Sequence, residues 1–86
     1  MNILITGGLG FIGINTTLRY ANKGDNIVLF DNLNKVGSLD NLRLLKNYPN
    51  VKFIKGDLRI YNDVKSVFKD NMFDLIFHLG GQTAVT

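Results

Sequence analysis

Three glycines near the start of the chain have a spacing that suits the binding of a diphosphate: Gly7, Gly10 and Gly13. Gly7 permits a tight turn after a strand, Gly10 lets the backbone approach the anion without an intervening Cβ, and Gly13 lets the next helix lie close to a sheet. The free N–H groups of Phe11 and Ile12 would then face the phosphates from the positive end of that helix. The glycines could also form a plain turn, but their place between an apolar run and an amphipathic run predicts a dinucleotide site.

Asp31 is a second candidate, at the end of the next apolar run. It lies eighteen residues after Gly13, where a carboxylate can accept hydrogen bonds from both hydroxyls of an adenosine ribose. A 2′-phosphate at this position would meet a like charge, so the aspartate favours NAD over NADP. The alternative is that Asp31 only caps the turn that follows it. Together with the glycine loop, this residue predicts NAD as the cofactor.

The composition excludes several other kinds of site. The chain has no cysteine, its seven acidic residues are all aspartate and His78 is the one histidine, so a metal cluster is not expected. The net charge is +3, but the basic residues are scattered and favour a solvated surface over a nucleic-acid site. No apolar stretch approaches the roughly 20 residues that span a bilayer, and no charged leader precedes the first apolar run. We therefore expect a cytoplasmic protein without a metal, nucleic-acid or membrane partner.

The elements that would position the candidate residues follow from short apolar runs that alternate with helical patterns. The expected strands are 2–6, 26–31, 51–55 and 74–79, and the expected helices are about 11–22, 39–47 and 62–70. Strands joined by helical crossovers form right-handed parallel units. We therefore expect an α/β fold, a partial Rossmann-type parallel sheet with four strands in the order 3-2-1-4 and helix crossovers.

The last two strands are expected at the edges of this sheet. The third run alternates apolar residues with Lys52 and Lys55, as in an edge strand with one wetter face. The fourth run would pair with a fifth strand in the full six-strand order, and this sequence contains no such strand. Because an unpaired apolar edge invites pairing with another chain, we expect self-association through the fourth strand.

Four motifs together resemble the extended short-chain dehydrogenases/reductases that act on nucleotide sugars. They are TGGLGFIG at 6–13, FDNL at 30–33, GDLR at 56–59 and FHLGGQ at 77–82. The resemblance covers the whole chain but only the first part of such an enzyme. It implies that residues 1–86 are the N-terminal part of a NAD-binding Rossmann domain and that the substrate domain is absent.

Within this family, a group of smaller features is most similar to the epimerases that act at C2 of CDP-sugars with transient hydride transfer to NAD. The features are the two DNL motifs at 31–33 and 40–42, Gly37 and the pair Gly81-Gln82. A 4-epimerase or a 4,6-dehydratase of another nucleotide sugar remains the alternative. A non-catalytic nucleotide-binding module or an inert truncated remnant is the alternative of a different class.

The resemblance also implies contacts with each part of NAD. The pyrophosphate would be bound by Gly7, Gly10, Phe11 and Ile12, and the adenosine ribose by Asp31 and Asn32. The adenine would lie against Asp57 and Leu58, and the nicotinamide side against Leu79, Gly80 and Gly81. Asp57 would contact the adenine amino group and Leu58 would pack on the ring, although Asp57 could instead cap the turn before the third helix. The family usually has alanine where this chain has Gly80, which gives the backbone more freedom there.

No residue of the chain is assigned a catalytic role. Tyr61 and Lys65 have the spacing of the family's catalytic tyrosine and lysine, which places them on one helix face. The family's pair lies on the helix after a fifth strand, so we interpret Tyr61 and Lys65 as an ordinary surface pair. We interpret His78, a lone imidazole at the end of an apolar strand, as a hydrogen-bonded core residue and not a general base. The resemblance implies a nucleotide sugar as a partner of the intact enzyme only.

Overall fold

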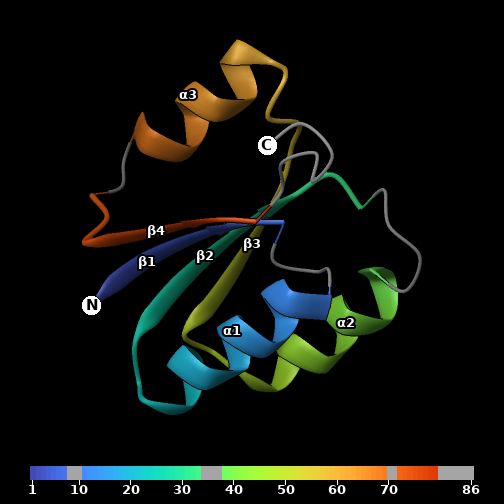
Figure 1. The fold of residues 1–86 in the computed structure, drawn as a ribbon, viewed down its shortest axis with the longest axis vertical. Helices are drawn as coiled ribbons and strands as arrows, with labels where there is room; N and C mark the ends of the chain where they lie inside the picture. The colour runs from blue at the N-terminus through green and yellow to red at the C-terminus, as the bar shows by residue number, and fades with distance from the viewer. Residues whose placement is uncertain (8–10, 34–37, 70–71, 80–86) are drawn as a thin grey trace.

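The computed structural model describes residues 1–7, 11–33, 38–69 and 72–79 (Figure 1). Strands and helices alternate along the chain as β1 (Asn2–Thr6), α1 (Phe11–Asn22), β2 (Asn26–Asp31), α2 (Ser38–Leu44), a 3₁₀ turn η1 (Leu45–Asn47), β3 (Val51–Lys55), α3 (Tyr61–Lys69) and β4 (Leu75–His78). The expected α/β class is confirmed. None of the helices in the described ranges is long and apolar enough to cross a membrane.

Three elements differ in their bounds from the expected ones. Helix α3 begins one residue early, at Tyr61, and α2 begins at Ser38. The helix expected over 39–47 is an α-helix only as far as Leu44 and then tightens into η1, a common way for a helix to end. The strand expected over 74–79 is assigned to the four residues of β4. The N–H groups of Asp74 and Leu79 nevertheless donate to carbonyls of β1, at 2.8 and 2.9 Å, so the pairing with β1 extends one residue beyond each end of the strand.

The four strands form one parallel sheet in the order β3-β2-β1-β4, as predicted. Ile3 of β1 lies level with Ile27 of β2 on one side and with Leu75 of β4 on the other. Helices α1 and α2 cover one face of the sheet and α3 covers the other (Figure 1). After β1 the chain continues to β2 on one side of β1, and it later returns as β4 on the other side of β1. The connections that follow β1 and β3 therefore run in opposite directions, away from the point between β1 and β4. In parallel α/β sheets, ligands bind at this point, outside the carboxyl ends of the strands.

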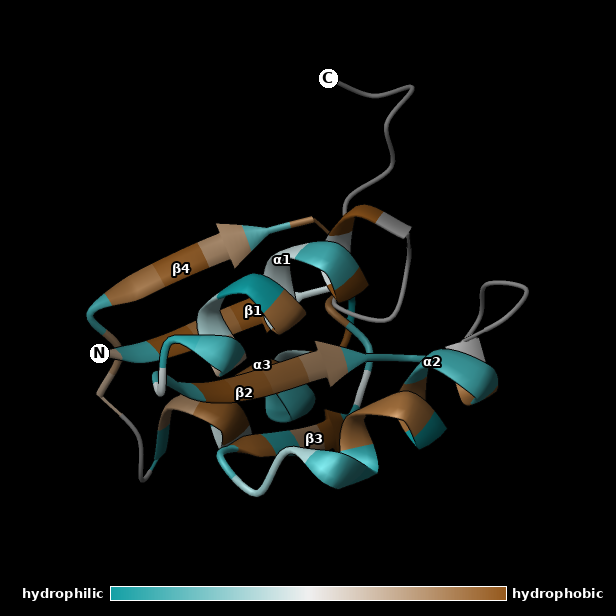
Figure 2. Ribbon diagram, turned by 90° about the horizontal axis from the view of Figure 1, so that it is seen from below, coloured by the Kyte–Doolittle hydropathy of each residue, from teal (hydrophilic) through white to brown (hydrophobic). Residues whose placement is uncertain are grey.

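The side chains of the two central strands alternate between apolar clusters on the two faces of the sheet. The larger cluster faces α1 and η1 and consists of Ile3, Ile5, Ile14, Ala21, Ile27, Leu29 and Leu45. The smaller cluster faces α3 and consists of Leu4, Phe30 and Val67. Burial of one such side chain contributes about 1.5 to 3 kcal/mol to the stability of the fold. The continuous apolar runs of β1 and β2 therefore stabilise the packing of helices on both faces of the sheet. Figure 2 shows these strands in the colours of hydrophobic residues.

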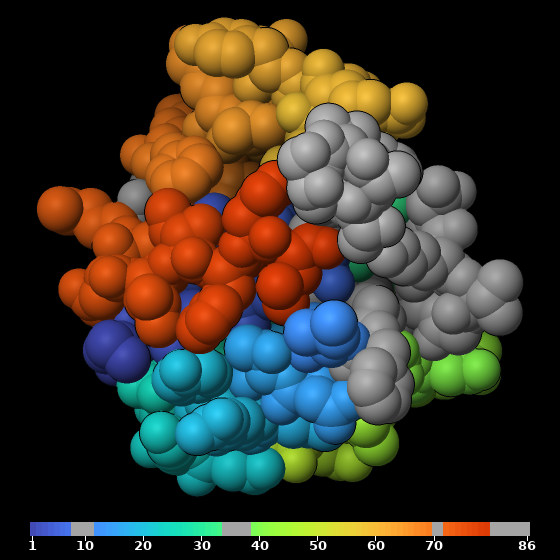
Figure 3. Space-filling model, in the orientation of Figure 1, coloured from blue at the N-terminus to red at the C-terminus, as the bar shows by residue number. Residues whose placement is uncertain are grey.

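The outer strands are less buried than the inner ones. In β1 every residue after the first is buried, whereas β4 alternates between half-buried and exposed positions. Figure 3 shows the atoms of β4 at the surface, between α3 above and α1 below. In β3 the exposed positions are Lys52 and Lys55, which agrees with the edge strand expected there.

Candidate functional site

The connection from β1 to α1 begins with a glycine turn at the carboxyl end of the sheet. Gly7 has a φ of 72°, in the left-handed region that favours glycine, and its N–H donates to a β2 carbonyl at 2.8 Å. Helix α1 begins at Phe11, so its N-terminus lies where the connections diverge. Ile12 is exposed in the first turn, whereas Gly13 is buried. Gly10 lies outside the described residues.

Asp31 ends β2 and is 8% exposed. Its Oδ1 accepts a hydrogen bond from the N–H of Leu33 at 2.7 Å, and the positive φ of Leu33, 61°, closes a tight turn. The capping interaction that was the alternative interpretation of Asp31 is therefore present. It fixes the carboxylate at the strand end, and since a carboxylate has about four lone-pair sites, capping is compatible with binding a ligand hydroxyl. The neighbouring Asn32 is exposed.

Gly56 brings the ends of β2 and β3 close together. Its N–H donates to the carbonyl of Asp31 at 3.1 Å. A Cβ at this position would lie 2.5 and 2.6 Å from Cε2 and Cζ of Phe30, closer than atoms can pack, and in a tight contact of 3.3 Å with Cβ of Asp63. The ring of Phe30 therefore requires glycine here. The ends of these two strands therefore carry Asp31 and Asp57 to the same edge of the sheet.

Asp57 follows β3 and forms an ion pair within its own turn. Its carboxylate accepts the backbone N–H of Arg59 at 2.8 Å, the Nε of Arg59 at 3.1 and 3.2 Å and its Nη2 at 2.7 Å. Hydrogen bonding by the guanidinium, more than the charge alone, lowers the pKa of Asp57 from 3.8 to about 2. The N–H of Asp57 donates to Oδ2 of Asp63 at 2.9 Å, which anchors the turn to α3. The predicted Leu58 is half-buried against the cluster that faces α3.

Sequence reasoning missed the role of Arg59. The signal was present in the motif GDLR, since an aspartate two residues before an arginine can accept both its backbone and side-chain donors. Without the turn geometry, however, the sequence does not distinguish this pair from two independently solvated charges. The structure thus adds a cation beside one of the two predicted adenosine-side carboxylates.

The end of β4 reaches the same edge. Leu79 is half-buried against the larger cluster and its N–H donates to the carbonyl of Thr6, while Gly80 and Gly81 lie outside the described residues. The Oγ1 of Thr6 lies 2.9 Å from Nδ1 of His78. The expected hydrogen bond of His78 is therefore confirmed, but the residue is exposed, so the expectation that it lies in the core was wrong. Among the residues that the structure describes, β4 has a neighbour on one side only, which leaves its last residue exposed.

Two further features lie outside this arrangement. Tyr61 is 74% exposed and the Nζ of Lys65 lies 6.0 Å from its ring centre, which is the geometry of a surface pair on α3.

In the part of the chain that the structure describes, no group of three or more histidine and acidic residues could hold a metal ion.

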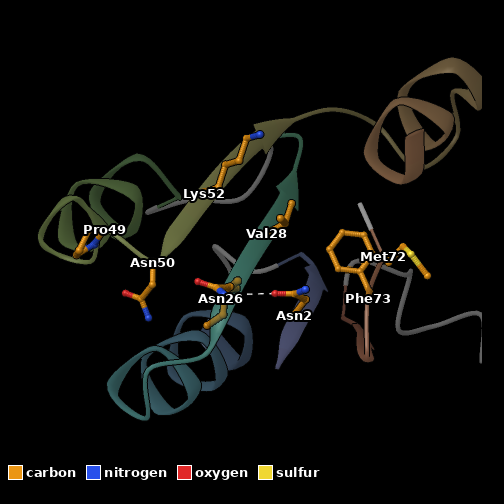
Figure 4. A pocket seen from close by; sticks show the side chains of 9 residues that line it. Asn2, Asn26, Val28, Pro49, Asn50, Lys52, Met72 and Phe73 are labelled. Carbon is orange, nitrogen blue, oxygen red and sulfur yellow. Dashed lines mark hydrogen bonds between the residues drawn. The ribbon is translucent and has the colours of Figure 1, made fainter. Parts of the chain in front are cut away.

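A hollow of about 320 Å³ lies at the opposite end of the sheet (Figure 4). Its lining includes Asn2 and Asn26, at the amino ends of β1 and β2, joined by a hydrogen bond of 3.3 Å. Lys52, Met72 and Phe73 also line it. Because α/β sheets bind ligands at the carboxyl ends of their strands, we do not include this hollow in the candidate site.

The carboxyl edge combines two kinds of chemistry. The N-terminus of α1 presents backbone donors and a positive dipole end, which suit a phosphate. The carboxylates at the ends of β2 and β3 accept hydrogen bonds, which suits hydroxyl and amino groups. A nucleotide with a diphosphate matches both.

Comparisons with known proteins agree with this arrangement. The sequence profile of the GDP-mannose 4,6 dehydratase family matches residues 4–86. CDP-paratose 2-epimerase of Salmonella typhi is 43% identical over 86 residues, which are 100% of this chain and 25% of that enzyme. The bifunctional UDP-glucose 4-epimerase and UDP-xylose 4-epimerase 3 of Arabidopsis thaliana is 36% identical over 98% of this chain and 25% of its own length. The chain thus spans about a quarter of the length of these curated relatives.

Solved structures give the same result. The UDP-glucose 4-epimerase of Bifidobacterium longum in complex with NAD+ and UDP superposes with a TM-score of 0.79 at 31% identity, over 95% of this chain and 25% of that one. The dTDP-glucose 4,6-dehydratase of Bacillus anthracis in complex with NAD gives a TM-score of 0.77 at 30% identity, over 99% and 28%. Because the family profile matches residues 4–86 of this chain and the predicted strand order is observed, the chain belongs to the GDP-mannose 4,6 dehydratase family of extended short-chain dehydrogenases/reductases.

Proposed function

We propose that residues 1–86 bind the adenosine and diphosphate portion of NAD and form the N-terminal part of a NAD-binding Rossmann domain. The observation that carries the proposal is the carboxylate of Asp31, fixed at the end of β2 beside the glycine turn and the start of α1. An acidic group here accepts ribose hydroxyls and repels a 2′-phosphate, which favours NAD over NADP. Two similar solved structures are described as complexes with NAD, which supports the choice of cofactor.

The residues proposed to hold NAD are divided among the strand ends. The turn between β1 and α1 and the first residues of α1 would bind the pyrophosphate, through Gly7, Gly10, Phe11, Ile12 and Gly13. The end of β2 would bind the ribose through Asp31 and Asn32, and the end of β3 would bind the adenine through Asp57 and Leu58. The nicotinamide side would lie at the end of β4, against Leu79, Gly80 and Gly81. The left-handed turn at Gly7 and the nearly buried Asp31 fit this cofactor. NAD supplies a hydride acceptor, and the residues of this chain bind and orient it.

For the intact enzyme, we propose a cytoplasmic epimerase of a CDP-sugar that acts at C2. The support is the 43% identity with CDP-paratose 2-epimerase, compared with 36% for the bifunctional UDP-sugar 4-epimerase. A 4-epimerase or 4,6-dehydratase of another nucleotide sugar is the second candidate, and it is favoured by the similarity to solved structures of both kinds. The exposed pair Tyr61 and Lys65 has no catalytic role in either proposal.

The test is calorimetric titration of the chain with NAD and NADP, compared with the variant Asp31→Ala. Loss of hydrogen bonds to a charged group costs about 1.5 to 3 kcal/mol, so we expect NAD to bind the variant at least tenfold more weakly. The preference for NAD over NADP should also decrease. Asp40→Ala is the matched control, because Asp40 lies on α2 and its side chain is 81% exposed. Equal heats from the chain and Asp31→Ala would contradict the proposal.

A further inference from the structure

Arg59 forms an ion pair whose position does not suit a role in stability. The side chain of Arg59 is 86% exposed, and its Nη2 lies 2.7 Å from Oδ2 of Asp57, whose side chain is 20% exposed. Ion pairs at the surface add little to the free energy of unfolding, because water already solvates both charges. The pair does, however, lie at the carboxyl end of β3, on the edge of the sheet that carries the candidate site.

The backbone around Asp57 is fixed without the side chain of Arg59. The N–H of Asp57 donates to Oδ2 of Asp63 at 2.9 Å, and its carbonyl accepts the N–H of Ile60 at 3.0 Å. Leu58 packs with the apolar cluster that faces α3. The guanidinium therefore acts on the carboxylate of Asp57 and is not needed for the path of the chain.

The hydrogen bonds from Arg59 fill most of the acceptor sites of this carboxylate. Oδ1 accepts the backbone N–H of Arg59 at 2.8 Å and the Nε at 3.1 Å, and Oδ2 accepts the Nη2 at 2.7 Å. The Nε carries a single hydrogen, so its longer contact of 3.2 Å with Oδ2 is the second branch of a shared bond. A carboxylate has about four lone-pair sites. These three donors therefore leave about one site open, and it lies on Oδ2.

The same bonds define the direction of the open site. Two parallel N–H···O bonds from one guanidinium hold a carboxylate in a fixed plane. Hydrogen bonding by the guanidinium also lowers the pKa of Asp57 to about 2, so the carboxylate is ionised at neutral pH and can only accept hydrogen bonds. The end of β3 thus presents one oriented acceptor.

We propose that Arg59 is a positioning residue for the base of the nucleotide, because it holds Asp57 so that Oδ2 accepts one hydrogen bond from an exocyclic amino group. This inference rests on the proposed function, in which the adenine of NAD lies against Asp57 and Leu58. A base with an oxygen in place of the amino group would bring two acceptors together and lose the bond. Arg59 thus makes the site select an amino-bearing base without contacting that base.

Calorimetric titration of the chain with NAD and with nicotinamide hypoxanthine dinucleotide, in which an oxygen replaces the amino group of adenine, measures this selection. The unaltered chain should bind NAD at least about tenfold more tightly, because the analogue loses a hydrogen bond to a charged group. In Arg59→Ala this ratio of affinities should fall by a factor of about three to ten, a coupling typical of residues in contact. The reason is that the carboxylate can then rotate. Circular dichroism verifies that each variant is folded.

Two further variants separate the fork from the positive charge. Arg59→Lys keeps the charge, but an ammonium group cannot form two parallel bonds from one plane, so the ratio should stay low. Arg43→Ala is the matched control, because it removes an exposed arginine whose pair with Asp40 on α2 has a distance of 3.6 Å, and it should keep the ratio of the unaltered chain. Full selectivity in Arg59→Lys would mean that charge alone is sufficient, and it would overturn the proposal.

A double variant tests whether Arg59 acts through Asp57. The amide of Asp57→Asn can donate as well as accept, so this variant should bind the two dinucleotides with similar affinities. Adding Arg59→Ala to it should not change the ratio further, because the effects of residues that act through one another are not additive. A second change in the ratio would mean that Arg59 contacts the base directly, which contradicts a positioning role.

The titrations also distinguish this inference from the proposed function. An unchanged ratio in Arg59→Ala, or equal affinities of the unaltered chain for the two dinucleotides, would overturn the inference alone. In either case, weaker binding of NAD by Asp31→Ala would still support the proposed function. If the unaltered chain bound neither dinucleotide, both would be wrong.

Discussion

At the scale of single residues, Thr17 has a hydroxyl without a partner on the buried side of α1. The side chain is 0% exposed, and within the described ranges its Oγ1 makes no hydrogen bond. An unsatisfied buried hydroxyl costs about 1 to 3 kcal/mol, and valine has nearly the same shape and helix propensity. We therefore expect Thr17→Val to raise the free energy of unfolding by about 1 kcal/mol, measured by urea denaturation.

The neighbouring threonine is the control for this prediction. The Oγ1 of Thr16 donates to the carbonyl of Ile12 at 2.8 Å, so Thr16→Val removes a bond that exists and should not stabilise the fold. If Thr17→Val lowered the free energy of unfolding as well, the hydroxyl of Thr17 would have a partner in solution.

Arg59 gives a prediction about pH. It lowers the pKa of Asp57 from 3.8 to about 2, so the ionised pair stabilises the folded chain above pH 3.8, and this contribution is lost as the pH falls toward about 2. In Arg59→Ala the pKa of Asp57 should return toward 3.8, which NMR titration of the carboxyl carbon measures directly. The stability of the variant should then change less between pH 5 and pH 2.

Arg43→Ala is the matched control, because Arg43 forms an exposed pair with Asp40 at 3.6 Å. It should leave the titration of Asp57 unchanged. An unaltered titration of Asp57 in Arg59→Ala would mean that the turn itself, and not the guanidinium, holds the carboxylate ionised.

At the scale of elements, the ends of β2 and β3 are joined through Gly56. In Gly56→Ala the new methyl would lie 2.5 and 2.6 Å from ring atoms of Phe30, which is 2% exposed and has no room to move freely. Overpacking of this kind costs about 1 to 3 kcal/mol. Displacement of Phe30 also shifts the next residue, Asp31, so we expect both a lower free energy of unfolding by urea and weaker binding of NAD by calorimetry.

Gly24→Ala separates the two effects. Gly24 has a φ of 90° and no atoms within 4 Å of its missing Cβ, so alanine there adds backbone strain without a clash, at about 1 kcal/mol. It should lower stability but leave the affinity for NAD unchanged. If Gly56→Ala bound NAD as tightly as Gly24→Ala, the packing of Phe30 would not position Asp31.

At the scale of the whole molecule, the strands could be predicted because their physical signals are local, and their order followed from the order that Rossmann-type sheets share. β1 and β2 are apolar along their length since helices cover both faces, and β3 shows its edge position through Lys52 and Lys55. The exposure of His78 and the pairing of Arg59 with Asp57 could not be predicted, because they depend on neighbours distant in sequence or on turn geometry. The same holds for the close approach of Gly56 to Phe30.

The central position of β1 has a consequence for the order of folding. β2 follows β1 closely in the chain, but the second neighbour of β1 begins only at Leu75. At about 5 to 20 residues per second, a ribosome needs roughly 3 to 14 seconds to add the chain between β1 and β4. Pairing between distant segments is also slow, because closing the loop costs entropy before any contact forms. Of the two inner strands of the described sheet, the first to be made is therefore the last to be enclosed on both sides, and chaperones would meet it with one edge still unpaired.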